Sequence, residues 1–324
     1  LKLTGQLDGA AQYTLATRHR LKTMTTISRD KVIYYFSKDN DPVIEIDTGE
    51  ELLVETLDTS NGTVVEPQDH ITETRKGVRP GKSNPQTGPI AIRGAKAGDT
   101  LVIEIISITP ASHGFLGVFP GVALGNPRWG RVQTVTIDDT EIQFNDNIKL
   151  PIRPMIGTIG VAPAGVPVPT THNGSHGGNL DLTAITSGTK VLLPISVDGG
   201  LLALGDVHAC QGDGELAGSA IEVNSEVRLR CELLAGQHKR PVLETATAWI
   251  TCACAADLEG ALRLAIADMV ELLEEKLGVN REEANMLVSA AGDARIGAAG
   301  GWGIDVTAAV EFPQPGTPNG PITT

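Results

Sequence analysis

The chain has few aromatic residues, an excess of acids over bases, and no long apolar run. Aromatic residues make up 3% of its 324 residues, and 39 Asp and Glu outnumber 26 Lys and Arg, for a net charge of −13. Proteins that read nucleic acids need clustered basic groups and aromatic rings that stack on bases. A membrane span needs roughly 18–20 consecutive apolar residues. We therefore expect neither a nucleic-acid partner nor a membrane partner.

Several familiar motifs are also missing. The four cysteines, Cys210, Cys231, Cys252 and Cys254, form neither a Cys-x-x-Cys pair nor a dense disulfide framework, so we expect reduced thiols and a cytoplasmic location. There is no Gly-x-Ser-x-Gly elbow, no P-loop, and no Gly-x-Gly-x-x-Gly after a strand. These absences argue against serine hydrolases of that type, nucleotide hydrolases and dinucleotide-binding enzymes.

The composition along the chain suggests an extension and two domains. Residues 1–23 are polar and basic near their end, and we interpret them as an extension or expression scar. Residues 24–165 are predicted to form a β-rich N-terminal domain. Residues 166–324 are predicted to form an α+β C-terminal domain that carries the histidine-containing clusters.

The local patterns predict a β-rich α+β fold. From residue 25 to about 250, strand-like segments alternate with Pro and Gly turns, which indicates barrel-like or sandwich-like strands. Residues 153–176 are rich in Pro and Gly and predict a long ordered loop. A helix is expected over 258–277, with Asp257 as its N-cap and Gly278 after its end, and a second helix after Asn280. Helical spacing puts one apolar face of the first helix on a sheet, formed by Leu262, Ile266, Met269, Leu272, Leu273 and Leu277.

The most informative segment is 205–215, which joins an apolar run to a glycine-rich turn. Asp206 and His208 are two residues apart, so on a strand their side chains share one face. Glu222 follows in an apolar strand, on the face opposite Ile221 and Val223, and a buried Glu there would need a cation or hydrogen-bond donors. These groups suit a divalent cation or general acid–base chemistry. A satisfied His–Asp hydrogen bond beside a turn is the alternative.

Three other segments carry polar side chains near glycine or proline. Residues 171–181 place two histidines and Asp181 in a glycine loop, which suits a metal or a polar substrate; an ordinary Asn/Gly-rich loop is the alternative. Asp58 ends a strand pattern and could join the other acids or simply close a turn. Residues 84–89 offer amide side chains and a rigid turn.

Longer strings in the sequence resemble those of the acetamidase/formamidase family. The specific ones are His-Gly-Gly-Asn-Leu-Asp at 176–181 and Gly-Asp-x-His-Ala-x-Gln-Gly-Asp-Gly-Glu at 205–215, within a resemblance that covers about residues 25–312. The resemblance implies a β-rich α+β fold and a cytoplasmic hydrolase that releases ammonia from small linear amides such as formamide or acetamide. It also implies a homo-oligomer, a dimer or higher.

Amide hydrolysis by metal-activated water would divide the polar residues among three roles. The expected cofactor is a divalent metal, zinc foremost, with calcium at a second site as an option. The metal ligands are expected among Asp58, His208, Glu222, Asp206 and Asp181. The catalytic residues are expected among Glu215, His176 and Asp213. The substrate, a small-molecule amide, is expected to contact Asn179, Gln211, Gly178 and Thr87. The same residues also fit two alternative functions. One is a metal-dependent cyclase or lyase, and the other is a non-catalytic β-rich module with a structural divalent cation.

Overall fold

The computed structural model describes residues 24–71, 82–122, 124–125, 128–236, 238–299 and 304–321. The predicted extension, residues 1–23, lies outside these ranges. Within them, no helix is both long enough and apolar enough to cross a bilayer.

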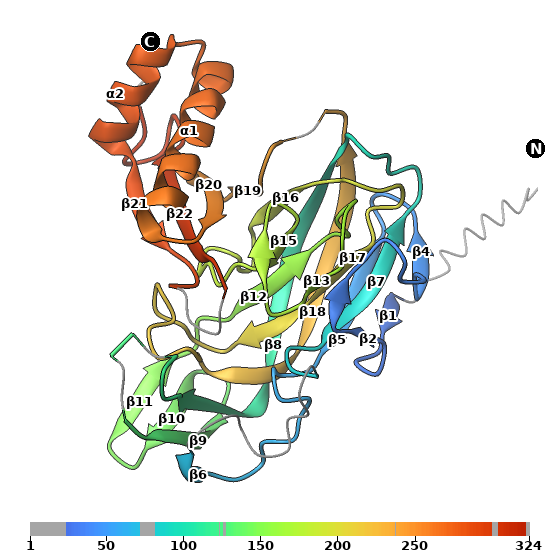
Figure 1. Ribbon diagram of the computed structural model, residues 1–324, viewed down its shortest axis with the longest axis vertical. Coiled ribbons are helices and arrows are strands. Elements are labelled where there is room, and N and C mark those ends of the chain that lie inside the picture. Colours follow the sequence, from blue (N-terminus) through green and yellow to red (C-terminus); the bar gives the residue numbers. More distant parts are fainter. Residues whose placement is uncertain are drawn as a thin grey trace, which may run out of the picture.

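The largest part of the protein is a curled, mostly antiparallel sheet (Figure 1). Nine strands follow one another across it, and only the pairing of the first two is parallel. In spatial order they are β1 (Thr25–Ile27), β5 (Glu51–Thr56), β18 (Glu222–Leu234), β8 (Thr100–Val118), β16 (Lys190–Pro194), β19 (Val242–Glu244), β20 (Ala248–Ala255), β22 (Val306–Pro313) and β21 (Asp293–Ile296).

A second layer of strands lies against the first, and among the described strands it joins the pairing of the first layer at one residue pair, His208 with Glu222. Its pairings are almost all antiparallel, with β4 parallel to its neighbour. Its strands are β2 (Val32–Ile33), β4 (Ile44–Ile46), β7 (Gln86–Ile92), β17 (Leu202–His208), β12 (Met155–Gly160), β15 (Gly177–Asn179) and β14 (Asn173–Gly174).

The remaining strands form an extension and a small ribbon. The far half of β8 continues into an antiparallel group at the end of the molecule opposite the helices (Figure 1). Its members are β6 (Gln68–Ile71), β9 (Gly130–Ile137), β10 (Glu141–Asn145) and β11 (Ile148–Pro151). The ribbon pairs β3 (Tyr35–Phe36) with β13 (Val168–Pro169).

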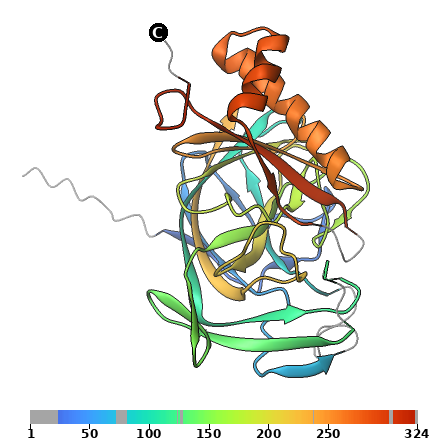
Figure 2. The same cartoon turned by 90° about the vertical axis from the view of Figure 1, so that its left-hand side faces the viewer.

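Two helices cover β20 and β22 (Figure 2). The first, α1 (Leu258–Leu277), begins at Asp257, whose side chain accepts from the Gly260 N–H, and ends at left-handed Gly278. The second, α2 (Arg281–Ala291), begins with a reciprocal pair of hydrogen bonds between Asn280 and Glu283. The predicted helical pair packed on a sheet is confirmed, as is the β-rich α+β class.

The buried face of α1 differs from the predicted one in its first half. Ala261 and Ala265 are fully buried, whereas Ile266 is 37% exposed. The hydroxyl of Thr251 on β20 donates to the Ala265 carbonyl over 2.7 Å. Small alanines let the helix come this close to the sheet, so they take the place expected for larger residues. From Met269 to Leu273 the predicted face is correct.

The predicted loop over 153–176 is wrong in its first part, because residues 155–160 form β12, a fully buried strand between β15 and β17. Gly157 and Gly160 on this strand leave room for neighbouring side chains and backbone rather than ending it. The division at residue 165 stays a prediction. Strands from its two sides pair directly, as in β8 with β18 and β7 with β17.

Candidate active site

Three buried side chains meet where β17 ends and β18 begins. The Nε2 atom of His208 lies 3.2 Å from Oδ1 of Asp206 and 3.5 Å from Oε2 of Glu222. His208 is 1% exposed, and the two acids are each 3% exposed. The predicted convergence of these residues is therefore present, and the face of β18 that carries Glu222 is buried.

Two further acids complete what we call the carboxylate–imidazole cluster: Asp181, Asp206, His208, Glu215 and Glu222. Ligand atoms of Asp181, Asp206 and His208 lie within 4.8 Å of one another, and so do those of His208, Glu215 and Glu222. Asp181 follows β15 and is 1% exposed. Glu215, on the loop between β17 and β18, is half-buried, which makes it the acid of the cluster with most access to solvent.

Glycine on β12 provides the space between two of these acids. A Cβ atom at Gly157 would lie 2.7 Å from Oδ1 of Asp181 and 2.9 Å from Oδ2 of Asp206. Any larger residue would push the carboxylates aside. The residue next to it, Thr158, donates its hydroxyl to Oδ2 of Asp206 over 2.9 Å. The sequence predicts neither residue as part of a site, because the Pro and Gly content of 153–176 indicates a loop where the structure has β12.

Glu222 is held by hydroxyl groups on both of its oxygens. Thr59 donates to Oε2 over 3.0 Å, and Ser219 donates to Oε1 over 3.1 Å. These donors fix the carboxylate while leaving Oε2 turned to His208. The sequence contained no signal for Thr59 or Ser219, since the contacts join distant segments.

A layer of amide side chains surrounds Asp181 and Asp206. Asn179 donates from Nδ2 to Oδ2 of Asp181 over 3.0 Å, and Asn84 donates to Oδ1 of Asn179 over 3.1 Å and to Oδ2 of Asp206 over 3.3 Å. Gln86 in turn donates to Oδ1 of Asn84 over 2.6 Å. Asn179, which is expected to contact substrate, is thus already engaged in orienting Asp181.

The backbone is unusual at the same positions. Asn84, Asp181, Asp206 and Glu215 have positive φ angles of 57°, 51°, 54° and 44°. Side chains other than glycine rarely adopt this region, and each such residue costs on the order of 1 kcal/mol. Four of the six non-glycine residues with positive φ in the described ranges belong to the cluster or its amide layer. Such concentration of strain is typical of functional sites.

The electrostatics of the cluster follow from its composition, four carboxyl groups and one imidazole. Burial raises the pKa of Asp181 well above its usual range, and the charges of Glu215 and Asp206 add to this. The pKa of Glu215 is raised to about 8, chiefly by burial; the charge of His208 opposes this rise, and the carboxylates of Glu222 and Asp206 contribute to it. Burial lowers the pKa of His208, but the carboxylates of Glu222 and Asp206 outweigh it, so the net direction is well above the usual value. Excess negative charge must thus be balanced, by protons or by a cation.

The donor set fits a divalent cation. Oδ1 of Asp181 is buried with no hydrogen-bond partner in the described structure. The separations of 3.2 and 3.5 Å from His208 Nε2 to the two carboxylate oxygens match the edge, about 3.3 Å, of a zinc tetrahedron with bonds of about 2.0–2.1 Å. Oxygen-rich sites also suit calcium. The cluster could therefore bind a divalent metal ion.

Other predicted residues lie outside the cluster. Oδ1 of Asp58 accepts from the backbone and hydroxyl of Ser60 and from the Gly62 N–H over 2.6–2.9 Å, so this carboxylate closes its own turn. That turn presents the neighbouring Thr59 to Glu222. Thr87 on β7 donates to the Glu55 carbonyl over 2.7 Å. Asp213 is exposed and pairs with Arg295 over 2.7 Å.

His176 and Gly178 form a separate buried pair. The His176 ring packs edge-on against Phe36 with centroids 5.1 Å apart, and its Nε2 atom is buried with no hydrogen-bond partner in the described structure. Burial lowers the pKa of His176 to about 4. Gly178 has φ of +83°, and a Cβ there would lie 3.0 Å from that Nε2 and 2.2 Å from the His172 carbonyl. The glycine therefore lets the loop close over the histidine.

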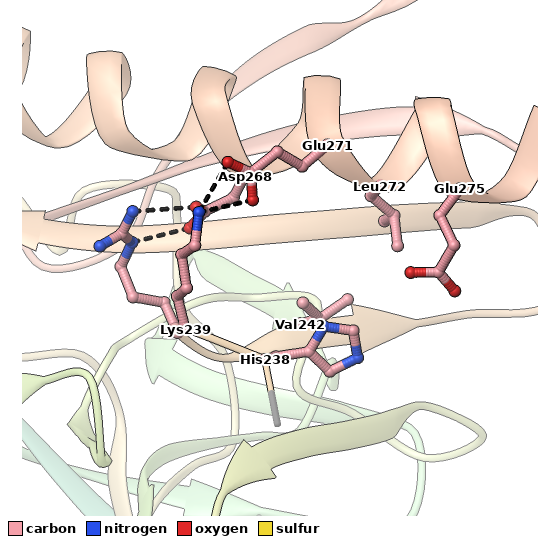
Figure 3. Close-up of a pocket in the computed structure, with 8 residues that line it drawn as sticks. His238, Lys239, Val242, Asp268, Glu271, Leu272 and Glu275 are labelled. Atoms are coloured by element: carbon pink, nitrogen blue, oxygen red, sulfur yellow. Dashed lines mark hydrogen bonds and ion pairs between the residues drawn. The ribbon is translucent and has the colours of Figure 1, made fainter. Parts of the chain in front are cut away.

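A cavity of about 190 Å³ elsewhere contains none of the predicted site residues (Figure 3). It lies between α1 and the connection from β18 to β19. Lys239 pairs with Glu271 over 2.6 Å and Arg240 with Asp268 over 2.7 Å across it (Figure 3). These ion pairs tie α1 to the connection between β18 and β19.

The fold and the cluster together define a class: a β-rich scaffold, capped by a helical pair, that buries a carboxylate–imidazole centre at a strand junction. The sequence model of the Acetamidase/Formamidase family matches residues 25–174 and 164–300. The chain belongs to this family, and the predicted resemblance is confirmed.

Solved structures agree with this assignment. An acetamidase from Bacillus halodurans is 32% identical with a TM-score of 0.84, and the match covers 89% of this chain and 97% of that one. A protein described as a predicted acetamidase/formamidase, from Thermoanaerobacter tengcongensis, is 38% identical with a TM-score of 0.84, over 89% and 95% of the two chains.

The matches to curated relatives cover a smaller part of both chains than the matches to the solved structures do. The acetamidase of Mycolicibacterium smegmatis is 24% identical over 216 residues, which is 46% of this chain and 53% of the relative. A relative from Schizosaccharomyces pombe is 26% identical over 250 residues, 58% of this chain and 60% of the relative. The chain therefore spans little more than half the length of these curated relatives.

Proposed function

We propose that the protein hydrolyses small linear amides, such as formamide or acetamide, to a carboxylate and ammonia. Family membership supports this reaction class. The observation that carries it is the buried carboxylate–imidazole cluster, in which His208 faces Asp206 and Glu222 at 3.2 and 3.5 Å.

A divalent cation, zinc foremost, would be held by His208, Asp206, Glu222 and Asp181. When bound, such an ion polarises the amide carbonyl and lowers the pKa of a water molecule to about 7. Asp58 is left out of this set because its carboxylate already accepts three hydrogen bonds within its own turn.

Glu215 would move the protons. A carboxyl oxygen of Glu215 lies within 4.8 Å of ligand atoms of His208 and Glu222, and the residue as a whole is the least buried of the four acids. Hydrolysis needs one proton taken from water and one given to the leaving nitrogen, and a single carboxyl beside the reacting groups can do both. His176 and Asp213 have no described contact with the cluster, and their contacts suit structural roles.

The amide layer would set the geometry of the acids. Asn179 and Gln211 both donate to Asp181, through its carboxylate and its carbonyl respectively, and so would orient that residue. A direct contact of either amide with substrate would require it to give up these bonds. Gly178 shapes the loop above, and Thr87 ties β7 to the end of β5.

The test is ammonia release from formamide and acetamide by protein stripped of metal and then reloaded with zinc, calcium or magnesium. We expect turnover with at least one ion and loss of turnover on stripping. Glu215→Gln should reduce kcat by at least about 100-fold. Asp213→Asn, which changes an exposed acid on the same loop, is the matched control and should retain activity. Tight metal binding without ammonia release would favour the structural-cation module, and release of a cyclised or eliminated product would favour a cyclase or lyase.

Further proposals concern the assembly. We expect a cytoplasmic homo-oligomer, a dimer or higher, and light scattering coupled to size exclusion would measure the subunit number. A second site for calcium and the two-domain division at residue 165 also remain proposals. Elemental analysis and limited proteolysis would test these two.

A further inference from the structure

Gln211 connects two members of the cluster through its side-chain amide. Its Nε2 donates to the backbone carbonyl of Asp181 over 2.6 Å, and its Oε1 lies 2.7 Å from Nδ1 of His208. Gln211 is 5% exposed. The amide thus spans from the loop after β15 to the end of β17.

These two contacts fix the orientation of the amide. A carbonyl oxygen only accepts, so the atom facing the Asp181 carbonyl must be the nitrogen. The atom facing His208 is then the oxygen, which also only accepts. Nδ1 of His208 must therefore carry a proton. In the neutral ring the other nitrogen, Nε2, is left with its lone pair.

That lone pair points at negative oxygens. Nε2 lies 3.2 Å from Oδ1 of Asp206 and 3.5 Å from Oε2 of Glu222. A bare nitrogen facing two carboxylates is repulsive, so Nε2 either holds a second proton, as the imidazolium of a metal-free site would, or faces a cation that takes the place of that proton. A divalent cation satisfies all three atoms, since histidine ligands commonly donate their other N–H to a fixed acceptor.

We infer that Gln211 is a positioning residue that locks His208 in the Nδ1–H tautomer and thereby makes Nε2 the atom offered to a divalent cation. The inference rests on the proposed metal-assisted function, but the tautomer can be measured apart from catalysis. It also links the ring to Asp181, because one amide holds the backbone of one ligand and the imidazole of the other.

Two variants separate the tautomer lock from general packing. Gln211→Met keeps the length of the side chain but neither donates nor accepts strongly. Gln211→Glu keeps the acceptor for Nδ1–H and loses the donor to Asp181. Gln143→Met, on β10, is the matched control, since the Gln143 amide bonds to the Asn145 carbonyl instead.

The experiment combines long-range ¹H–¹⁵N NMR of histidine-labelled protein, with and without zinc, and zinc affinity measured against a competing chelator. In the zinc-loaded parent we expect His208 protonated at Nδ1 and metallated at Nε2. Gln211→Met should bind zinc about 10- to 100-fold more weakly. Gln211→Glu should keep the Nδ1–H tautomer, and Gln143→Met should match the parent.

Two results would overturn the inference: zinc bound through Nδ1, or parent-like zinc affinity in Gln211→Met. If Gln211→Met does not fold, the test rests on Gln211→Glu. Loss of the Nδ1–H tautomer of His208 in that variant would contradict the inference that residue 211 holds this tautomer. Ammonia release is measured separately on the same samples. A parent that shows the expected tautomer but no ammonia release would remove the proposed function while leaving the lock intact.

Discussion

His208 and Glu222 are direct cross-strand partners, the one residue pair that joins β17 to β18. Their side chains approach to 3.5 Å in a buried environment. The same pair marks where the inner layer of strands meets the outer curl, so the architecture itself brings an acid and an imidazole together.

Removing the charge of Glu222 should disable the site without unfolding the protein. Glu222→Gln preserves shape and can still accept from Thr59 through its carbonyl oxygen. We expect kcat/KM for formamide to fall by at least about 100-fold, together with weaker metal binding. Steady-state ammonia assays and chelator competition would measure both. Glu226→Gln, at an exposed position of the same strand, should behave as the parent. Activity near the parent level in Glu222→Gln would exclude this acid from the chemistry.

A methyl group at Gly157 should separate the two acids beside it. The added Cβ would lie within 2.9 Å of both Asp181 and Asp206 carboxylate oxygens. We expect Gly157→Ala to lose roughly 1–3 kcal/mol of stability and most of its activity. Urea unfolding and ammonia release would report these losses. Gly165→Ala, where the new Cβ meets nothing within 4 Å, is the control. Equal stability and equal ammonia release in both variants would show that this gap is not needed.

His176 should make the protein less stable in mild acid. Its folded pKa of about 4 lies below the ordinary 6.5, so the unfolded chain binds the proton first as the pH falls. The free energy of unfolding should therefore drop between about pH 6.5 and pH 4, by roughly 3 kcal/mol from this residue. Urea titrations at several pH values should give a shallower fall for His176→Phe than for the parent. His113→Phe, at an exposed position, should keep the parent slope. Identical slopes in all three proteins would contradict the shift.

Metal removal should lower Tm. A cation that binds the folded cluster and not the unfolded chain contributes RT ln(1 + [M]/Kd), about 2.7 kcal/mol at a concentration of 100 Kd. We expect zinc added to stripped protein to raise Tm in proportion to the logarithm of its concentration. The rise in Tm on adding zinc should vanish in the double variant Asp206→Asn/Glu222→Gln. An unchanged Tm in the parent would count against a metal in this cluster.

The sequence predicted those parts of the site that depend on strand alternation and on recognisable strings. The spacing of Asp206 and His208 predicts that they share a face, the apolar strand around Glu222 marks that acid, and a glycine-rich motif marks Asp181; the structure brings all four into one cluster. Asp58 illustrates the limit. A carboxylate at a strand end can face a site or accept hydrogen bonds within its own turn. The Asp58 carboxylate accepts from the N–H groups of Ser60 and Gly62, so it closes the turn.

The fold was predictable to a similar extent. Caps at Asp257 and Asn280 are local signals, and both helices begin where these predict. The sequence does not predict β12, because its glycines are typical of a loop. In the structure these glycines make room for Asp181, Asp206 and the loop at His176. β12 forms because segments distant in the sequence pack closely against it, and the local sequence pattern carries no information about that packing.

The left-handed backbone at Asn84, Asp181, Asp206 and Glu215 has a consequence for anyone engineering this protein. Selection for thermal robustness alone will favour glycine at these four places, because glycine accepts that conformation without penalty. Each such gain would delete a carboxyl or amide from the centre. A stabilisation campaign should therefore hold these positions fixed and seek its improvements in the helical cap or the outer strands.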